Sequence, residues 1–383
     1  MLAMAQFESK ILVTGGLSGE VVLINVATGV CVHTIGKSGD LVHINKIIAK
    51  DNLLAVGGNP WIRVHSLDNI RSPPTIYNGH KNNVTTISFQ QDSKWFITAG
   101  EDGQALIWDL RGKGYQTSIN HGPGINCGCL HPNQGVFLFG DQEGYLNQLD
   151  LAANKIIRSS VGSGSGIGVS NLAIDSFGRA VCSHDNKIVS IFKDISLEED
   201  AVLDLDENLN FHDDSSPRNA LSAPPMLLPL ISRSVSSPKP PVTSRIKEHT
   251  TLHRSPPDAI GTFGKELEES TYVTSVKYCH PTNRSTGALA VSYSTGFIRL
   301  FKTNSYDGTF ELQVTMEPMQ SQASTKTWCW DTVFLDEDGK LLLSSFASGE
   351  CVLTDSTRPL EHVTMHVFGE TKFARTMAIV AQN

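Results

Sequence analysis

Three residues with complementary chemistry, His80, Thr98 and Asp102, lie close together in the sequence. A hydroxyl next to a histidine that an aspartate orients is the arrangement that many hydrolases use for nucleophilic catalysis. The set alone is therefore compatible with a hydrolase. Whether the three residues are catalytic depends on the secondary-structure elements that hold their side chains.

Two glycine-rich stretches resemble phosphate-binding loops but have the wrong spacing. "GKS" at 36–38 would end such a loop, yet Cys31 stands where a glycine is required five residues before Gly36. "GSGSGIG" at 162–168 has neither the G-x-G-x-x-G nor the G-x-S-x-G order. Neither stretch predicts a nucleotide site, and we expect no bound cofactor.

The cysteines and the net charge argue against two further classes of function. The seven cysteines include no C-x-x-C pair, so we expect reduced, mostly buried thiols and no metal site. Cys127 and Cys129 lie two apart on an expected strand and should pack on one face rather than form a disulfide. A net charge of −8, with 31 basic and 39 acidic residues, argues against nucleic acid as a partner.

The sequence also lacks the patterns of export and membrane insertion. The first residues, "MLAMAQFESKILV", have no basic start followed by an apolar stretch, and no run of about 18 apolar residues occurs. We expect a soluble, cytoplasmic protein without a transmembrane segment, which reaches endomembranes only as part of a complex.

A repeat of about 40 residues runs through the chain. Trp108 follows Gly103 by five positions, and the same glycine-plus-five spacing recurs in four other copies, whereas the copies ending at His65 and Phe192 lack the glycine. The seven end positions are 24, 65, 108, 149, 192, 301 and 354, so the first four steps are 41, 43, 41 and 43 residues.

Each copy contains the same order of elements. An alternating apolar strand such as "NVTTISF" is followed by a polar turn, a second strand such as "WFITAG", a tight turn and a third strand. The turns combine Asp, Asn, Pro and Gly, as chain reversals between strands require. Four short antiparallel strands in each of seven copies predict an all-β, seven-bladed β-propeller. The fourth strand is the most variable in sequence.

The two ends of the chain are expected to close the ring together. The first copy begins with "ILVTGG", which matches a second strand, so its first strand is missing. "TMAIVA" at 376–381 follows the seventh copy and has no blade of its own. We predict that it pairs with Ile11–Thr14, which removes an open sheet edge.

One segment does not fit the repeat. The step from Phe192 to Phe301 is 109 residues, and the excess is an acidic, then Ser/Pro-rich, stretch. We predict propeller blades 1–5 in 9–195, a disordered insertion between blades 5 and 6 in 196–270, and blades 6–7 with the closing strand in 271–383. Candidate sites of proline-directed phosphorylation in the insertion are Ser216, Ser237 and Ser255, with a neutral, fast-drifting loop as the alternative.

Residues 77–111 closely resemble a WD repeat. The resemblance implies that His80, Thr98, Asp102 and Trp108 form one buried hydrogen-bonded chain with a structural role. Because a buried Asp and His are costly unless every polar atom is paired, a satisfied network would fix the geometry of the blade. All four residues occupy the structural positions of the repeat, so we expect no catalysis and no enzyme.

Longer stretches resemble one family, the seven-bladed GβL or Lst-eight subunit of target of rapamycin (TOR) kinase complexes. The stretches are "GHKNNVTTISFQQDSKWFITAGEDGQALIWDLR", "INCGCLHPNQGVFLFGDQEGYLNQLDL" and "TWCWDTVF". The resemblance implies a non-catalytic scaffold that binds the carboxy-terminal lobe of the kinase domain and stabilises it, in the two complexes (TORC1 and TORC2) that govern growth and the actin cytoskeleton. It implies no homo-oligomer. The alternative is a generic WD-repeat adaptor or substrate receptor of the ubiquitin-ligase or vesicle-coat type.

The candidate partner surface centres on two tryptophans. Trp328 and Trp330 stand at the start of the innermost strand of the seventh blade, where family members carry the same W-x-W pair. Both could instead pack between blades. If one ring is exposed, it is an anchor, because Trp is over-represented among residues that dominate interfaces. Lys81, Asn82 and Asn83 would add contacts at the same end of the ring.

Overall fold

The computed structural model describes most of the chain, and every regular element within the described residues is a β-strand. None of the described segments is a helix long and apolar enough to cross a membrane. The described ranges are 10–36, 43–112, 114–161, 166–194, 245–246, 250–254, 259–268, 270–279, 286–304, 309–317, 328–360, 362–367 and 374–381.

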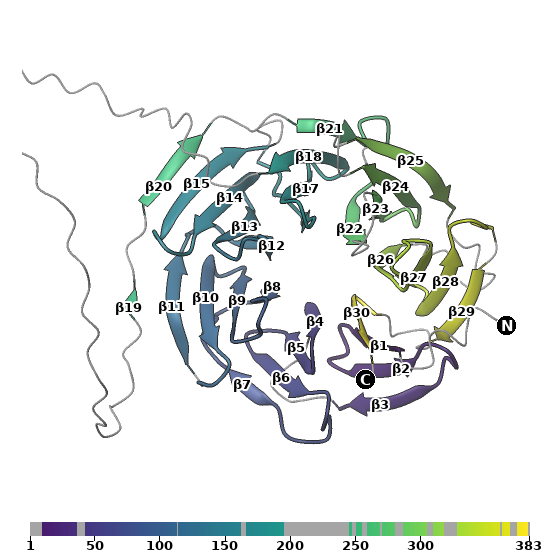
Figure 1. The fold of residues 1–383 in the computed structure, drawn as a ribbon, viewed down its shortest axis with the longest axis horizontal. Helices are drawn as coiled ribbons and strands as arrows, with labels where there is room; N and C mark the ends of the chain where they lie inside the picture. The colour runs from purple at the N-terminus through teal and green to yellow at the C-terminus, as the bar shows by residue number, and fades with distance from the viewer. Residues whose placement is uncertain are drawn as a thin grey trace, which may run out of the picture.

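Seven sheets stand side by side in a ring, as Figure 1 shows, and each contains a set of four antiparallel strands, one in an inner layer and three in successive outer layers. This confirms the predicted seven-bladed propeller. The innermost strands are β30 (Thr376–Ala381), β4 (Lys46–Lys50), β8 (Val84–Phe89), β12 (Ile125–Leu130), β16 (Asn171–Ile174), β22 (Val273–Cys279) and β26 (Cys329–Phe334). The second strands are β1 (Lys10–Gly15), β5 (Leu53–Gly57), β9 (Trp95–Gly100), β13 (Val136–Asp141), β17 (Arg179–His184), β23 (Thr286–Tyr293) and β27 (Leu341–Phe346).

The outer two layers complete each blade. The third strands are β2 (Val21–Asn25), β6 (Ile62–Ser66), β10 (Gln104–Asp109), β14 (Tyr145–Asp150), β18 (Ile188–Asp194), β24 (Ile298–Asn304) and β28 (Glu350–Asp355). The fourth strands are β3 (Cys31–Ile35), β7 (Thr75–Tyr77), β11 (Tyr115–Asn120), β15 (Lys155–Ser160), β21 (Ala259–Phe263), β25 (Phe310–Met316) and β29 (His362–Val367).

The repeat read from the sequence corresponds to equivalent positions in the blades. Each of the seven end positions lies on a third strand, is buried, and pairs with a buried apolar residue of the second strand. The pairs are Ile24 with Leu12, His65 with Leu54, Trp108 with Phe96, Leu149 with Phe137, Phe192 with Ala180, Phe301 with Leu289, and Thr354 with Leu342.

The glycines of the repeat are needed by the turns between the second and third strands. Gly19, Gly103, Gly144, Gly296 and Gly349 have φ values of 74°, 71°, 88°, 88° and 88°. This left-handed conformation is open to glycine at little cost and strained for most other residues. The glycine-plus-five spacing therefore reflects one turn geometry that recurs in five blades.

The chain closes the ring as predicted. β30 pairs with β1 in antiparallel register, from Lys10 opposite Ala381 to Gly15 opposite Thr376. The first blade therefore combines three strands from the start of the described chain with one from its end (Figure 1). The inner edge of β1 is thereby paired, as is the inner edge of the second strand in each of the other six blades.

The apolar core lies between blades rather than within them. The described residues form seven buried hydrophobic clusters, and each contains side chains from two neighbouring blades. The cluster between blades 2 and 3, for example, contains Ile62 and Tyr77 of one blade and Phe96 and Trp108 of the next. Every blade therefore depends on both neighbours to remove its apolar faces from water.

Hydrogen bonds near the ring centre also cross from blade to blade. At four consecutive junctions between neighbouring blades, here called seams, a polar side chain of one innermost strand donates a hydrogen bond to the blade that follows. These bonds run from Thr85 to the Ile125 carbonyl (2.7 Å), from Asn126 to the Val169 carbonyl (3.2 Å), from Asn171 to the Val273 carbonyl (3.0 Å) and from Ser275 to the Asp331 carboxylate (2.7 Å).

Asp331 carries this series across the closing seam. Its second carboxylate oxygen accepts the backbone N–H of Met377 in β30 at 2.9 Å. The Thr376 hydroxyl in turn accepts the backbone N–H of Ile47 in blade 2 at 3.2 Å. The Asn45 amide of blade 2 donates to Asn83 of blade 3 at 3.2 Å. With this bond, each of the seven junctions between neighbouring blades is crossed by a hydrogen bond.

The structure moves the end of the predicted insertion. β21, at 259–263, pairs with β18 and is the fourth strand of blade 5, so the ring resumes before 271 and the insertion enters within this blade. Composition did not indicate this strand because fourth strands lie at the outer edge, where little apolar pattern is required. Residues 195–244, 247–249 and 255–258, with the candidate phosphorylation sites Ser216, Ser237 and Ser255, lie outside the described residues.

Two further strands correct the prediction of disorder for part of the insertion. β19 (Arg245–Ile246) pairs in parallel with β11 of blade 3, and β20 (Thr250–Arg254) pairs in parallel with β15 of blade 4. β19 and β20 therefore add to the outer edges of blades 3 and 4, ahead of β21 in blade 5 (Figure 1). The unpaired outer edge of a blade can accept such a segment through its backbone alone, whatever its composition.

Removal of β30 should open the ring. A chain that ends at Arg375 loses the partner of β1 and the N–H that Asp331 accepts, so we expect aggregation and loss of a cooperative melting transition. The measurement is size-exclusion chromatography with light scattering, together with thermal unfolding. A chain that ends at Ala381 keeps every paired residue and is the matched control. A soluble monomer with unchanged melting after removal of β30 would contradict the closure.

Candidate functional site

The four residues of the predicted network lie together in blade 3. His80 precedes β8, Thr98 lies on β9, Asp102 lies in the turn after β9, and Trp108 lies on β10. The Thr98 hydroxyl accepts the indole N–H of Trp108 at 2.8 Å and lies 2.8 Å from the Nε2 atom of His80. The Nδ1 atom of His80 lies 3.0 Å from the nearer Asp102 oxygen. With the Nδ1–H tautomer, Trp108 donates to Thr98, Thr98 donates to His80, and His80 donates to Asp102 in a single chain.

Asp102 is the charged end of this chain. Burial favours its neutral form, but hydrogen bonds from His80 and from the backbone of Lys81 and Gln104 outweigh this effect and hold its pKa below the ordinary value. The backbone N–H of Lys81 donates to the carboxylate at 2.8 Å and that of Gln104 at 3.2 Å. Because the folded-state pKa is lowered, this stabilisation is complete at neutral pH and is lost as the pH falls through the folded pKa.

This arrangement is unsuited to hydrolysis. The Thr98 side chain is fully buried, and its oxygen is already bonded to His80 and Trp108. A nucleophile needs access to a substrate atom, which a hydroxyl inside a packed blade does not have. The geometry instead serves to hold two strands and a turn together.

Aromatic rings enclose the Trp108 end of the network. Trp108 is fully buried, with ring centroids of Tyr77, Phe96 and Tyr115 at 5.5, 6.1 and 5.6 Å. Tyr77 belongs to blade 2, so the side chain that completes the polar network also fills the seam to the preceding blade. Trp108 therefore both donates a hydrogen bond to the polar network and packs between blades 2 and 3.

Blade 4 contains a second buried network, which the sequence did not reveal. Asp141, fully buried at the end of β13, lies 3.0 Å from the Nε2 atom of His121 and accepts hydrogen bonds from Asn147 at 3.0 Å and Arg158 at 3.1 Å. Burial alone would raise the pKa of Asp141, but these partners and the backbone N–H of Tyr145 lower it. Asp141 aligns with Gly100 rather than with Asp102, so a search at the position of Asp102 misses it.

Blade 5 has a third arrangement. The Nε2 atom of His184 lies 2.9 Å from the Ser190 hydroxyl, and its Nδ1 atom lies 3.1 Å from Asp185. Ser190 also contacts the Thr262 hydroxyl at 3.2 Å, which ties β18 to β21. Blades 3, 4 and 5 thus each bury a histidine near an aspartate, in three different geometries.

The loops that precede the innermost strands define one end of the ring, here called the start face. Since each blade reverses direction between strands, the turns from the second to the third strand lie on this face as well. Trp328 immediately precedes β26 on the start face and is 45% exposed, whereas Trp330, the second residue of this strand, is half-buried. The two ring centroids lie 5.6 Å apart.

The other predicted contact residues share this face but not this side of the ring. Lys81 and Asn82 are exposed in the loop before β8, in blade 3, across the ring from β26 in blade 7 (Figure 1). Asn83 is half-buried, donates to Glu101 at 2.8 Å and accepts from Asn45 at 3.2 Å. The structure therefore brings Trp328 and Trp330 together and keeps Lys81, Asn82 and Asn83 apart from them.

Two exposed aromatic residues on the start face of blade 6, next to the blade of Trp328, were missed by the sequence analysis. Tyr272, 44% exposed, precedes β22, and Phe297, 37% exposed, lies in the turn between β23 and β24. The backbone of Tyr272 is bonded to Ser294 of this turn in both directions, at 2.9 and 3.0 Å. Together, Tyr272, Phe297 and Trp328 place aromatic side chains on the start face of blades 6 and 7. A large aromatic residue in a polar turn was the available signal.

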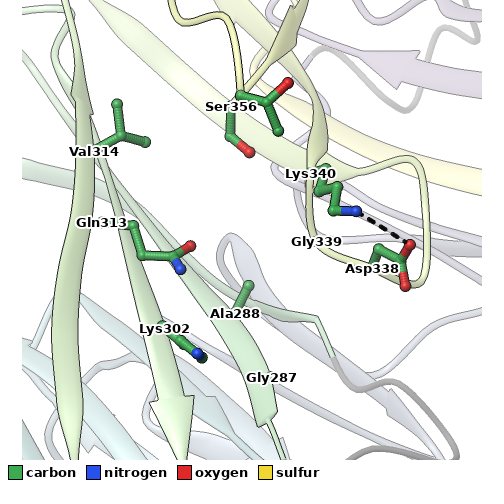
Figure 2. Close-up of a pocket in the computed structure, with 10 residues that line it drawn as sticks. Gly287, Ala288, Lys302, Gln313, Val314, Asp338, Gly339, Lys340 and Ser356 are labelled. Atoms are coloured by element: carbon green, nitrogen blue, oxygen red, sulfur yellow. Dashed lines mark ion pairs between the residues drawn. The ribbon is translucent and has the colours of Figure 1, made fainter.

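A separate groove lies between blades 6 and 7 at the opposite end of these blades. It has a volume of about 330 Å³ and is lined by Lys302, Asp338 and Lys340 among other residues. Figure 2 shows Lys340 paired with Asp338, at 3.6 Å, with Lys302 on the facing strand. The lining residues include no histidine or cysteine, and the described residues contain no group of three or more His, Cys, Asp or Glu that could hold a metal ion.

Comparison with known proteins agrees with this geometry. The family model described as "WD domain, G-beta repeat" matches residues 71–109, the blade with the complete network. The Cps50 (Swd1) β-propeller domain of Myceliophteria thermophila is similar in fold, with a TM-score of 0.54 over 82% of this chain and 86% of that one, at 12% identity. The ring of seven blades and the repeat define the chain as a WD-repeat β-propeller.

Sequence similarity then shows which WD-repeat proteins this chain resembles. The chain is 31% identical to the target of rapamycin complex subunit wat1 of Schizosaccharomyces pombe, over 47% of this chain and 57% of that protein. It is 35% identical to the target of rapamycin complex subunit LST8 of Bos taurus, over 37% and 44%, and 34% identical to that of Saccharomyces cerevisiae, over 34% and 43%. The matches thus span about half the length of these relatives. They confirm the resemblance to the LST8 family.

Loss of Trp108 should destabilise the propeller. Trp108→Ala removes a fully buried ring and one partner of Thr98, which should cost roughly 3 to 5 kcal/mol of unfolding free energy. Chemical denaturation measures the change. Trp108→Phe keeps an aromatic ring but removes the indole N–H, so its cost should be smaller, about 1 to 3 kcal/mol. A loss below about 1 kcal/mol for the alanine variant would contradict the role of Trp108 in both core and network.

Proposed function

We propose that this chain is a non-catalytic scaffold subunit of a TOR-type kinase complex that binds and stabilises the carboxy-terminal lobe of the kinase domain. The relatives that it matches are named as target of rapamycin complex subunits. A WD-repeat propeller whose polar networks are buried and paired supports a binding role rather than a catalytic one. Such a subunit would work in the cytoplasm, in growth signalling.

One observation indicates which surface of the propeller would bind the kinase. The start face of the adjacent blades 6 and 7 exposes three aromatic side chains, Tyr272, Phe297 and Trp328, at 44%, 37% and 45%. Aromatic side chains are enriched at the centres of protein interfaces, where they supply much of the binding energy. We place the kinase contact here, with Lys81 and Asn82 as peripheral contacts of a partner broad enough to cross the ring.

A rigid support is what such an anchor needs. Trp328 is fixed by its backbone carbonyl, which accepts the N–H of Ala347 at 2.8 Å, and by its contact with Trp330. Residues presented on a rigid scaffold lose little conformational freedom on binding, so more of their contact energy appears as affinity. The propeller would contribute to the complex by holding this surface in place.

Replacement of Trp328 should separate binding from folding. Since Trp328 is partly exposed, Trp328→Ala should leave the melting temperature nearly unchanged. Loss of an interface anchor should reduce co-purification of the kinase at least tenfold, which corresponds to about 1.4 kcal/mol or more. The measurement is capture of the tagged chain from cells, with quantitation of the bound kinase.

Phe177 offers the matched control. It is a 55% exposed aromatic residue in the turn between β16 and β17, at the end of the ring opposite the start face. Phe177→Ala should leave kinase capture unchanged. Equal loss in both variants, or a joint loss of binding and melting temperature in Trp328→Ala, would exclude the start face as the docking surface. Capture of ubiquitin-ligase or vesicle-coat components in place of a kinase would favour a generic WD-repeat adaptor.

A further inference from the structure

The centre of the ring contains a cavity of about 240 Å³ that the docking surface does not use. Residues in and just before the innermost strands of all seven blades line it. The cavity is smaller than the roughly 300 to 1,000 Å³ typical of drug-sized ligands. It therefore suits a small ion or a small charged group rather than a large cofactor.

The charges around this cavity are unbalanced. Its lining includes three basic residues, Lys46, Lys277 and Arg375, and one acidic residue, Asp331. Burial raises the pKa of Cys127, which also lines the cavity, to about 12, so this thiol is uncharged at neutral pH. The lining thus has a net charge of +2 in a chain whose net charge is −8.

The basic residues come from three separate blades, and all three line the cavity. Lys277 of blade 6 lies 3.3 Å from Asp331 of blade 7, and Arg375, before β30, donates to Asn45 at 2.9 Å. Lys46 of blade 2 is close enough to Lys277 and Asp331 to interact with both charges. Lys277 is therefore paired with the one carboxylate of the lining, whereas Lys46, from another blade, is not.

Lys46 is the residue whose charge is least compensated. Its ammonium group makes no hydrogen bond or ion pair to another described residue. Burial, and then the charge of Lys277, lower the pKa of Lys46 to about 8, which still leaves it mostly protonated at neutral pH. The Thr274 hydroxyl, in the same lining, is buried and has no hydrogen-bonding partner among the described residues. A cation and a hydroxyl donor thus remain available inside the ring.

We propose that the central cavity binds a small anion carrying a phosphate group, held by Lys46, Lys277 and Arg375. A phosphate monoester carries about −1.5 to −2 charges at pH 7 and presents three strong acceptor oxygens. Its charge matches the excess of +2 in the lining, and its oxygens match the ammonium, guanidinium and hydroxyl donors. Since a bound anion would bridge blades 1, 2 and 6, it would also add contacts across the ring interior.

The binding test uses inorganic phosphate and the intact chain. Phosphate is titrated into the protein by isothermal calorimetry, in a chloride buffer of constant ionic strength. We expect one site per chain and a rise in melting temperature relative to chloride, because a ligand that binds the folded state alone stabilises it. Absence of both heat and thermal shift would overturn the proposal.

Two variants and a matched control assign the site. Lys46→Met and Arg375→Gln should each weaken phosphate binding at least tenfold. Lys94→Met removes a lysine that is exposed outside the cavity, in the turn after β8, and should bind phosphate as the unmodified chain does. Equal affinity in Lys46→Met and Lys94→Met would overturn the assignment. The melting temperature of each variant without ligand shows whether it is folded.

Two further titrations define the ligand. Tighter binding of glycerol phosphate than of inorganic phosphate would identify a phosphate monoester as the physiological class, whereas equal binding would identify the phosphate group itself. Acetate tests whether any carboxylate suffices. Acetate binding as tight as phosphate binding would overturn the choice of phosphate and favour an acidic side chain of a partner protein.

Discussion

The apolar faces of each blade leave water only by packing against a neighbouring blade. Every hydrophobic cluster in the described residues spans a seam, and the innermost strands are joined across all seven seams by hydrogen bonds. A ring with one missing contact would therefore expose two apolar faces at once. This makes the pairing of β1 with β30, and the contact of Asp331 with Met377, the interactions on which the other blades depend.

The features that could be predicted from the sequence are those that every blade, or nearly every blade, repeats with the same local geometry. Gly103 and its equivalents could be read from the sequence because the turn between the second and third strands requires a left-handed residue. Trp108 and its equivalents could be read because they fill the same place opposite the second strand. The closing strand was predictable because the first blade lacked an inner strand and the chain had one apolar segment to spare.

The unpredicted parts are those that tolerate many sequences. β19, β20 and β21 pair along outer edges through backbone groups, so their composition does not identify them. The network of Asp141 lies at a different position of the repeat from that of Asp102, although both satisfy a buried carboxylate with a histidine. Tyr272 and Phe297 are far apart in sequence from Trp328, and only the arrangement of blades 6 and 7 places all three on one face of adjacent blades.

The buried charged groups of this ring have two kinds of surroundings. Asp102 and Asp141 lie inside blades, and every charge there is matched by donors that hold the pKa low. Lys46 and Lys277 line the ring centre with Asp331 as the one acidic residue of the lining, and only Lys277 is paired with it. The paired groups fix the blades, whereas the unbalanced centre retains a capacity to bind, and the exposed aromatic residues lie on the face where the innermost strands begin.

The pairing of β1 with β30 also sets an order of events during protein synthesis. Gly15 and Thr376, which are partners in the sheet, are separated by 361 positions in the chain (376 − 15). At a translation rate of about 5 to 20 residues per second, β1 waits roughly 20 to 70 s for its partner. During this interval blades 2 to 6 can assemble in order of synthesis, while the first blade keeps an unpaired apolar strand at its edge. The nascent chain is therefore most exposed to misassociation at β1, and a chaperone that shields Lys10–Gly15 would protect the propeller until β30 emerges.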